Sequence, residues 1–212
     1  MSIERIEPSP KWIRGTIGDR TVVDTRGAQL VWEHKYYPFW YIPEADVHDD
    51  TLPTTTVDEL PGHVKLDWAV VDRWFEENEE VFVHPRSPYT RIDALPSSRH
   101  VVIRVGGEIV ADTQTPTILF ETGLPTRYYL PPDDVRPDLL TPTDASTACP
   151  YKGVARYWSV TIDGEEHTDI AWGYDDPLPE SAPVKGLICF YNEKVDIEVD
   201  GESVERPVSP FS

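Results

Sequence analysis

The sequence predicts a mostly β protein that consists of two tandem small antiparallel β domains with short helical insertions. Three observations support this fold class. The 212 residues include 21 prolines and 12 glycines, which favour many turns and few long helices. Two-residue turn signals separate short apolar segments. An internal repeat recurs at a fixed spacing, which indicates that one structural unit occurs twice.

The internal repeat joins residues 18–47 to residues 106–135 without a gap. Nine of the thirty aligned positions carry the same amino acid, whereas ordinary composition gives about two by chance. The identical pairs are Gly18/Gly106, Val22/Val110, Asp24/Asp112, Thr25/Thr113, Glu33/Glu121, Tyr41/Tyr129, Pro43/Pro131, Asp46/Asp134 and Val47/Val135. Residues 78–83 also resemble residues 192–197. We therefore expect a first copy over residues 1–95 and a second over residues 96–212.

Turn signals divide the second copy into strands. Gly106-Gly107 and Asp163-Gly164 are typical of two-residue hairpin loops, and Asp200-Gly201 marks a further turn. The segments between the turns are expected to be strands over residues 101–105, 108–112, 155–162, 165–174, 187–191 and 194–199. Residues 132–135 predict one helical turn, with proline early and acidic residues near its positive end.

The middle of the first copy differs from that of the second. About fifty residues, 136–186, separate the repeated segments in the second copy. The first copy has a polar loop over residues 48–65 and then a predicted helix near residues 67–79. Asp67 can serve as the N-cap of that helix. The apolar face would contain Trp68, Val71, Trp74 and Phe75.

Composition and charge exclude several classes of partner. The formal net charge is −19 and the pI is about 4.5, so the chain repels phosphate backbones and anionic lipids. We expect neither nucleic-acid nor membrane partners. Because no apolar signal segment precedes residue 9 and only Cys149 and Cys189 are present, we expect a cytoplasmic protein. No Cys-x-x-Cys pair or ligand-spaced histidine pair occurs, so we expect no metal and no cofactor.

The candidate catalytic residues are Cys149, Lys152 and Glu121. A positive charge at Lys152 would favour a nucleophilic thiolate at Cys149. The alternative is a buried cysteine that acts as a small hydrophobe. Glu121 follows an apolar segment and could act as a general base. Its repeat partner Glu33, however, lies in the copy that has no Cys149 equivalent, which favours a structural role for both.

The candidate binding residues are Tyr129, Asp134, Arg156, Trp158, Trp172 and Tyr174. Arg156 and Lys152 could bind a carboxylate or phosphate, or could pair with nearby acidic side chains. Trp158 and Trp172 lie on opposite arms of the Asp163-Gly164 hairpin and could face each other across the strands as an aromatic pocket. The alternative is that these rings fill a core.

Five strings of the second copy form a specific pattern. They are Gly107-Glu108-Ile109-Val110-Ala111-Asp112-Thr113, Tyr129-Leu130-Pro131-Pro132-Asp133-Asp134-Val135, Cys149-Pro150-Tyr151-Lys152-Gly153-Val154-Ala155, Tyr157-Trp158, and Trp172-Gly173-Tyr174-Asp175-Asp176-Pro177-Leu178-Pro179. This pattern resembles the domain-of-unknown-function 427 family. The resemblance implies a compact antiparallel fold similar to the β-tent group, in which several families bind zinc or hold small ligands in aromatic pockets. It implies no established reaction.

These residues lead to one principal hypothesis of function. The second copy is expected to bind a small molecule, anionic or aromatic, while the first copy pairs with it intramolecularly as a scaffold. The alternative is an enzyme that uses Cys149 on a small metabolite. Nucleotidyl transfer is a remote alternative, because the sequence has neither a Gly-rich phosphate loop nor an Asp-x-Asp pair in a strand context. A structural or protein-interaction role also remains open.

Overall fold

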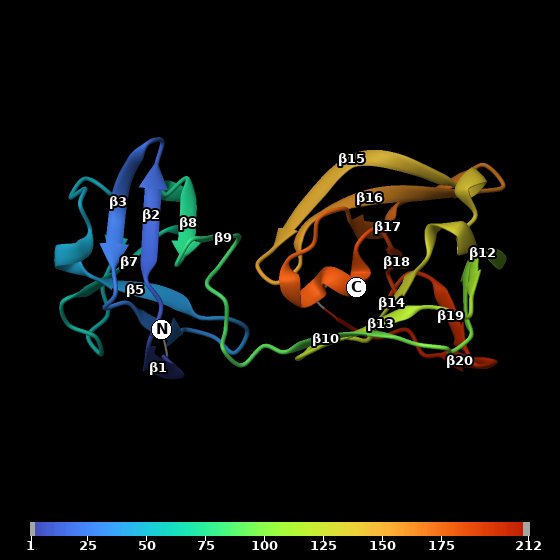
Figure 1. Cartoon of the computed structure of the whole chain (residues 1–212), viewed down its shortest axis with the longest axis horizontal. Helices are drawn as coiled ribbons and strands as arrows, with labels where there is room; N and C mark the ends of the chain where they lie inside the picture. Colours follow the sequence, from blue (N-terminus) through green and yellow to red (C-terminus); the bar gives the residue numbers. More distant parts are fainter. Residues whose placement is uncertain (1–2, 210–212) are drawn as a thin grey trace. The chain divides into compact units, whose positions relative to one another are not determined.

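The computed structural model describes residues 3–209 and divides the chain into two compact units, Met1–Pro88 and Tyr89–Ser212 (Figure 1). The sequence placed the boundary near residue 95. Strand β10 (Ile92–Pro96) contains that position and pairs with β13 (Thr117–Glu121) of the second unit. Pro96 can sit in β10 because β10 is an edge strand, where a missing N–H leaves no neighbour unpaired.

The first unit contains two antiparallel sheets. The five-stranded sheet has the order β1-β4-β5-β7-β6 and the four-stranded sheet the order β3-β2-β8-β9. Their strands are β1 (Arg5–Pro8), β2 (Ile13–Ile17), β3 (Arg20–Thr25), β4 (Gln29–Trp32), β5 (Phe39–Pro43), β6 (Thr54–Thr55), β7 (His63–Leu66), β8 (Arg73–Glu76) and β9 (Glu79–Val81). The 3₁₀ turns η1 (Glu44–Asp46) and η2 (Trp68–Val70) lie in the connections.

The second unit contains a seven-stranded sheet of order β10-β13-β14-β18-β17-β16-β15 and a four-stranded sheet of order β12-β11-β19-β20. Its remaining strands are β11 (Val101–Val105), β12 (Glu108–Thr113), β14 (Arg127–Leu130), β15 (Leu140–Cys149), β16 (Gly153–Ile162), β17 (Glu165–Tyr174), β18 (Ile188–Phe190), β19 (Asp196–Val199) and β20 (Glu202–Val204). The 3₁₀ turns are η3 (Pro132–Asp134), η4 (Pro137–Leu139) and η5 (Pro179–Val184).

The two units share one topology. Each strand of the first unit has a counterpart in the same position of the second, and β15 and β16 are the strands that only the second unit adds. The first hairpins even share a β-bulge, which lies between Gly15 and Thr16 in β2 and between Ile103 and Arg104 in β11. Each of these bulge positions is separated from its counterpart by the 88-residue spacing of the sequence repeat. A bulge at the same position in both units indicates common descent, because bulges are conserved within protein families.

The predicted match between residues 78–83 and residues 192–197 is wrong. In the structure β19 occupies the position of β8, because β11 pairs with β19 as β2 pairs with β8. Residues 79–81 form β9, whose counterpart is β20. The short string Asn-Glu recurs by chance before strands that are not equivalent.

The predicted helix over residues 67–79 is also wrong. Asp67 does act as an N-cap, since its carboxylate accepts a hydrogen bond from the Ala69 N–H, but the turn that it caps is η2, which is three residues long. The chain then forms the β8–β9 hairpin, with Glu77 at φ 53° between the two strands. Trp74 and Glu76 are buried while Arg73 is exposed. This alternation of buried and exposed side chains is that of a strand, and aromatic residues favour strands. Both effects outweigh the helical spacing of the apolar residues.

The fold class is confirmed as mostly antiparallel β, and the helical segments among residues 3–209 are short 3₁₀ turns. Within the described residues, no helix has the length and apolar character needed to cross a membrane. The predicted hairpins at Gly106-Gly107 and Asp163-Gly164 form as expected. Strand β15 was not predicted, because its sequence is polar and most of its residues are exposed at the sheet edge.

The two faces of the seven-stranded sheet bury different clusters. Successive side chains of a strand point to opposite faces, so Leu130 and Tyr129 belong to different clusters although they are neighbours. We call the face that packs against the four-stranded sheet the outer face. The opposite one is the inner face, whose buried residues are Leu119, Tyr129, Ala155, Tyr157, Trp172, Tyr174, Val184 and Cys189. Three of the nine residues expected to form a site, Tyr129, Trp172 and Tyr174, lie on this inner face.

Candidate functional site

The seven-stranded sheet curls so that its two ends meet. The turn between β15 and β16 carries Lys152, whose ammonium group donates a hydrogen bond to the carboxylate of Glu121 at the end of β13. One residue before, the Tyr151 hydroxyl lies 3.3 Å from the Thr90 Oγ1, next to β10. Figure 1 shows β15 and β16 arching over the inner face, with β10, β13 and β14 on the other side of it. The curvature therefore brings residues 121 and 152 together although the sheet order places them far apart.

The Lys152–Glu121 ion pair is largely removed from solvent. The exposed fractions of the two side chains are 11 % for Lys152 and 8 % for Glu121. A buried charge is tolerated only when it is paired, so each side chain depends on the other. The ammonium group has three donors. Among the residues that the structure describes, Glu121 is the only hydrogen-bond partner of the Lys152 ammonium group.

Tyr129 and Trp172 form the centre of the inner face. The Trp172 indole N–H donates to the Tyr129 hydroxyl over 3.3 Å, and the two rings meet edge to face with their centroids 6.3 Å apart. Burial raises the pKa of the Tyr129 hydroxyl well above its usual range, and nearby Cys189 and Tyr174 would raise it further if charged. Tyr129 therefore stays protonated. The two rings are packed as a core, which was the alternative expected from the sequence.

Tyr174 lies between the aromatic centre and the ion pair. Its exposed fraction is 4 %, and burial raises the pKa of its hydroxyl, with Cys149, Tyr157 and Glu121 close enough to add to the effect through their charges. Within residues 3–209 the Tyr174 hydroxyl has no hydrogen-bond partner. The phenol is thus a protonated donor that is available to a ligand. Cys149 is partly exposed at the end of β15 and is not in a disulfide.

Trp158 and Arg156 lie on the other face of the sheet from Trp172. The register pairs Trp158 with Ala171 and Tyr157 with Trp172, so the predicted facing pair Trp158–Trp172 is wrong. Counting from the Asp163-Gly164 turn, where Ile162 pairs with Glu165, already places Trp158 and Trp172 on opposite faces, and the bulge in the β16–β17 pairing shifts the register by two residues without changing this. Arg156 lies over the Trp158 ring at 4.5 Å and pairs with exposed Asp175 at 3.0 Å. Neither residue contributes to the inner face.

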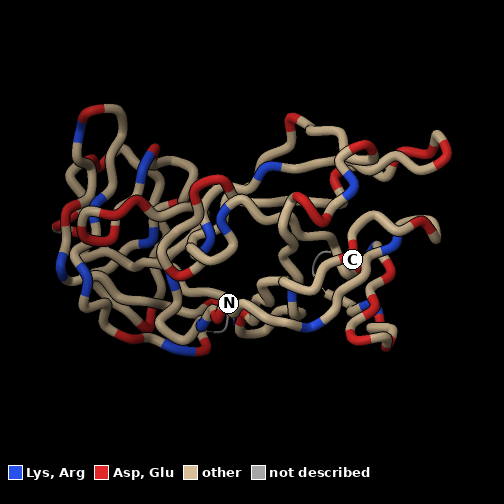
Figure 2. Tube along the Cα trace, turned by 45° about the vertical axis from the view of Figure 1, so that its right-hand side comes forward, with Lys and Arg blue, Asp and Glu red and all other residues tan. Residues whose placement is uncertain are grey.

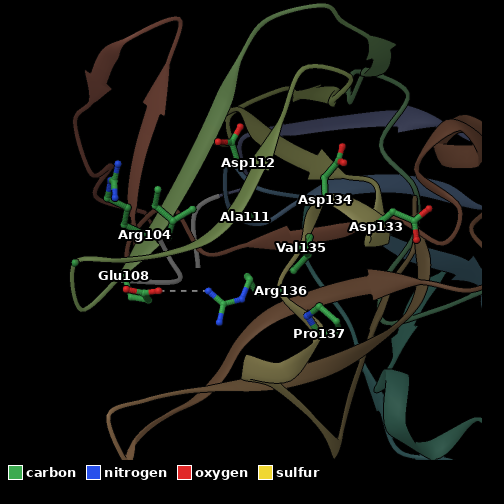
Figure 3. A pocket seen from close by; sticks show the side chains of 11 residues that line it. Arg104, Glu108, Ala111, Asp112, Asp133, Asp134, Val135, Arg136 and Pro137 are labelled. Atoms are coloured by element: carbon green, nitrogen blue, oxygen red, sulfur yellow. Dashed lines mark hydrogen bonds and ion pairs between the residues drawn. The ribbon is translucent and has the colours of Figure 1, made fainter.

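Asp134 has a structural role that is repeated in both units. The Thr113 hydroxyl donates to Asp134 over 2.6 Å, and Thr25 donates to Asp46 over the same distance. Asp134 also borders a surface hollow of about 630 Å³ in the second unit. Figure 3 shows Glu108 and Arg136 joined across this hollow by an ion pair of 3.3 Å. Its acidic side chains are therefore largely engaged by neighbours.

Sequence reasoning missed four important side chains of the inner face and its border. Tyr157 and Tyr191 extend the aromatic cluster, since their hydroxyls lie 3.5 Å apart and the Tyr191 ring is 4.4 Å from that of Trp172. Arg127 forms two hydrogen bonds to the carboxylate of Glu193, of 2.7 and 2.8 Å. In the sequence, Ala155 and Tyr157 stand on either side of the charged Arg156, and this alternation could have placed Tyr157 on a buried face. Nothing in the sequence connects residues 127 and 193.

The first unit repeats the carboxylate but draws its lysine from another element. Glu33, the counterpart of Glu121, accepts hydrogen bonds from Lys65 of 2.6 and 2.8 Å and from the Tyr41 hydroxyl. Because Ile42 pairs with Val64 as Leu130 pairs with Ile188, Lys65 occupies the position of Cys189. In each unit a lysine therefore neutralises the equivalent carboxylate, but the two lysines occupy positions that are not equivalent. This repetition supports the structural role that the sequence suggested for Glu33 and Glu121.

Acidic residues outnumber basic ones, and the charged residues are not gathered at the inner face. The chain has 38 acidic and 19 basic residues, and Figure 2 shows both kinds scattered along the trace of each unit. No group of three or more His, Cys, Asp or Glu side chains in the described part of the chain is arranged to hold a metal ion.

The two cysteines are expected to differ sharply in reactivity. Cys189 has no exposed surface, and burial raises the pKa of its thiol to about 12, although Arg127 opposes the shift. Iodoacetamide at about pH 8, near the pKa of a free thiol, should therefore modify Cys149 in the native protein and leave Cys189 unmodified. Peptide mass spectrometry measures both rates. Labelling of Cys189 at the rate of Cys149 would contradict the structure, and urea should expose Cys189 as a positive control.

The comparisons with known proteins agree with the repeat. A search of curated proteins found no match. The family model described as "Domain of unknown function (DUF427)" matches residues 5–66 and residues 93–201, which is more than half of the chain. The second match contains the β15–β16 hairpin and all residues of the inner face, whereas the first ends at the last residue of β7. The chain belongs to this family of domains of unknown function, DUF427, and contains it in both units.

Proposed function

We propose that the second unit binds a small anionic aromatic metabolite at the rim of the inner face. The observation that carries the proposal is the combination of Lys152, which has two donors without partners in the described chain, with the unpartnered hydroxyl of Tyr174. A lysine ammonium group has three N–H donors and a tyrosine hydroxyl has one, so both groups can donate to a ligand. A ligand carboxylate supplies the acceptors that both groups lack.

The surrounding side chains favour a ring in the ligand. Trp172 and Tyr129 are packed as a core, and Tyr174 belongs to the same cluster on the side of the ion pair. A ligand ring that enters beside Tyr174 would extend this aromatic cluster, and a few polar atoms would then fix the orientation of the ligand. Cys149 lies at the partly exposed border of this cluster, which is where a ligand would enter.

Isothermal titration with indole-3-carboxylate, and with indole-3-carboxamide as the uncharged control, tests the proposal. We expect the acid to bind more tightly than the amide, because charge-assisted hydrogen bonds are about twice as strong as neutral ones. Tyr174→Phe should weaken binding of the acid about threefold to tenfold, which corresponds to one lost hydrogen bond. Glu121→Gln should strengthen it, because the carboxylate of Glu121 competes for Lys152.

A matched control variant is available on the opposite face of the sheet. Tyr128 belongs to the outer cluster, so Tyr128→Phe should leave the affinity unchanged. Equal affinities for acid and amide, or equal losses in the two tyrosine variants, would refute the proposed site. Thermal unfolding of each variant establishes that the comparison is made between folded proteins.

A further inference from the structure

Strand β6 is an exposed edge of the five-stranded sheet of the first unit. Both of its residues, Thr54 and Thr55, are exposed, and β7 pairs with them on one side only. Successive residues of a strand direct their N–H and C=O groups to alternate sides, so one of the two residues directs these groups away from β7. An edge strand with unpaired backbone groups is a template for a further strand.

The repeat shows what occupies the equivalent edge in the second unit. Lys65 occupies the position of Cys189, as the pairing of β5 with β7 indicates. Thr55, which pairs with Lys65, therefore occupies the position of Trp172. Strand β6 is thus the counterpart of β17. In the second unit, β16 pairs with β17 on the side that is open in β6.

The residues of β16 at this pairing are aromatic. Tyr157 pairs with the counterpart of Thr55. The next residue, Trp158, pairs with the counterpart of Thr54. The exposed fractions of Tyr157 and Trp158 are only 7 % and 8 %. Because cross-strand side chains contact each other, a strand added to β6 would place two side chains against the threonines at positions that are aromatic in β16.

A hollow of about 500 Å³ lies beside this edge and is lined by both threonines of β6. Its lining also includes the rings of Tyr37, Phe39 and Trp68, which are partly exposed. Aromatic rings of a partner gain favourable edge and face contacts with such a surface. When an extended peptide adds a strand to a sheet edge, backbone hydrogen bonds provide affinity and side-chain pockets provide specificity. The β6 edge offers both features.

The surroundings of β6 are acidic. The loops on either side, residues 48–53 and 56–62, contain no lysine or arginine and four acidic residues, Asp49, Asp50, Asp58 and Glu59. Asp49 pairs with Arg20 at 3.0 Å, whereas the other three are exposed. Asp67, which lines the hollow, is also exposed.

The basic side chains that line the hollow do not offset this negative charge. Lys65 is neutralised by Glu33 at 2.6 Å. Burial lowers the pKa of the His84 imidazole, so His84 is neutral at pH 7. The local potential therefore attracts a basic partner and repels an acidic one.

We propose that the β6 edge of the first unit binds an extended, basic peptide segment of a partner protein, which adds one strand to the five-stranded sheet and places an aromatic side chain in the hollow. Because β6 has two residues and follows Pro53, few backbone hydrogen bonds form, and the aromatic side chain and the charges supply most of the affinity. The same shortness disfavours pairing between the β6 edges of two copies. This inference is independent of the site proposed for the second unit, since the two share no residue.

Fluorescence anisotropy of a fluorescein-labelled peptide, titrated with the full chain, tests this proposal. The probe is Lys-Lys-Val-Ala-Arg-Tyr-Trp-Ser-Val-Lys-Lys, which contains the sequence of residues 154–160 between pairs of lysines. One control peptide has alanine in place of both aromatic residues, and a second has glutamate in place of lysine and arginine. We expect the probe to bind and each control to bind about tenfold or more weakly, because buried aromatic anchors dominate the affinity of an interface and like charges repel.

A pair of protein variants tests the edge itself. Thr55→Lys places a positive charge beside the hollow and should weaken binding of the probe about tenfold, since like charges at an interface repel. Thr56→Lys adds the same charge at the next residue, which is exposed and does not line the hollow. It should weaken binding only about twofold, because exposed charges interact weakly. Thermal unfolding establishes that both variants are folded, and the control peptides need no variant.

Hydrogen exchange measured by mass spectrometry locates the bound peptide. The amides of residues 54–57 should exchange more slowly when the probe is bound, because an added strand pairs with the edge. The absence of binding, unchanged exchange in this segment, or equal affinities of the probe and the alanine peptide would overturn the proposal, as would equal affinities of the two threonine variants. Dimerisation of the chain alone that Thr55→Lys abolishes would also overturn it, because a second copy would then occupy the edge.

Discussion

Lys152→Met should lower the free energy of unfolding of the second unit by about 3–5 kcal/mol, because it leaves the carboxylate of Glu121 buried without a partner. The side chain of Glu121 is only 8 % exposed, so water cannot replace the lysine. Equilibrium urea unfolding measures the loss. The same substitution at Lys65 should have a similar effect on the first unit, where Glu33 is 6 % exposed.

The double variant Glu121→Leu/Lys152→Met distinguishes a buried ion pair from a packing defect. It removes both charges, so most of the lost stability should return, because replacing a buried pair by apolar groups is often neutral. Lys185→Met is the surface control, since Lys185 and Asp176 are 63 % and 97 % exposed and such pairs contribute little. A single Lys152→Met variant as stable as the Lys185→Met variant would show that the pair has no structural importance.

Arg127→Met is expected to produce a comparable loss at neutral pH, about 3–5 kcal/mol, and the loss should shrink in acid. Glu193 is 1 % exposed, and its pKa lies below the usual range because hydrogen bonds from Arg127 and Ser209 outweigh the opposing effect of burial. The pair therefore stabilises the folded state at every pH above the ordinary pKa of a glutamate, about 4.3. This stabilisation is lost as the pH falls through the lower folded-state pKa.

Urea unfolding at neutral pH and below about pH 4 measures this dependence. In acid, Glu193 becomes neutral in both proteins, so the difference between the unmodified protein and Arg127→Met should decrease. Arg136→Met, which removes a guanidinium from the exposed acids Glu108 and Asp138, should cause no measurable loss at either pH. A loss from Arg127→Met that does not change with pH would mean that packing of the guanidinium, and not its charge, stabilises this region.

The parts of the fold that the sequence revealed are those with local chemical signals. Gly106-Gly107 and Asp163-Gly164 specify hairpins because each provides the positive φ angles that a two-residue turn requires. The repeat was visible because it maintains a bulge and a threonine–aspartate hydrogen bond in both units. Strand β15 gave no such signal, since an exposed edge strand needs few apolar residues.

The candidate site was only partly predictable for the same reason. Glu121, Lys152, Tyr129, Trp172 and Tyr174 come together on one face as a cluster. Trp158 was wrongly assigned to that face, although the alternation counted from the Asp163-Gly164 turn already places it opposite Trp172. Arg127 and Glu193 meet because β14 and β18 are paired neighbours in the sheet, and this pairing of segments about sixty residues apart cannot be read from the sequence.

The rate at which iodoacetamide modifies Cys149, measured with and without indole-3-carboxylate, tests the proposed site of the second unit most directly. Cys149 borders the proposed site, and the buried thiol of Cys189 is the internal reference in the same sample. We predict that the acid slows the modification of Cys149 in a saturable way and that indole-3-carboxamide protects it far less. An unchanged rate at concentrations of the acid that saturate binding would contradict a site at the rim of the inner face.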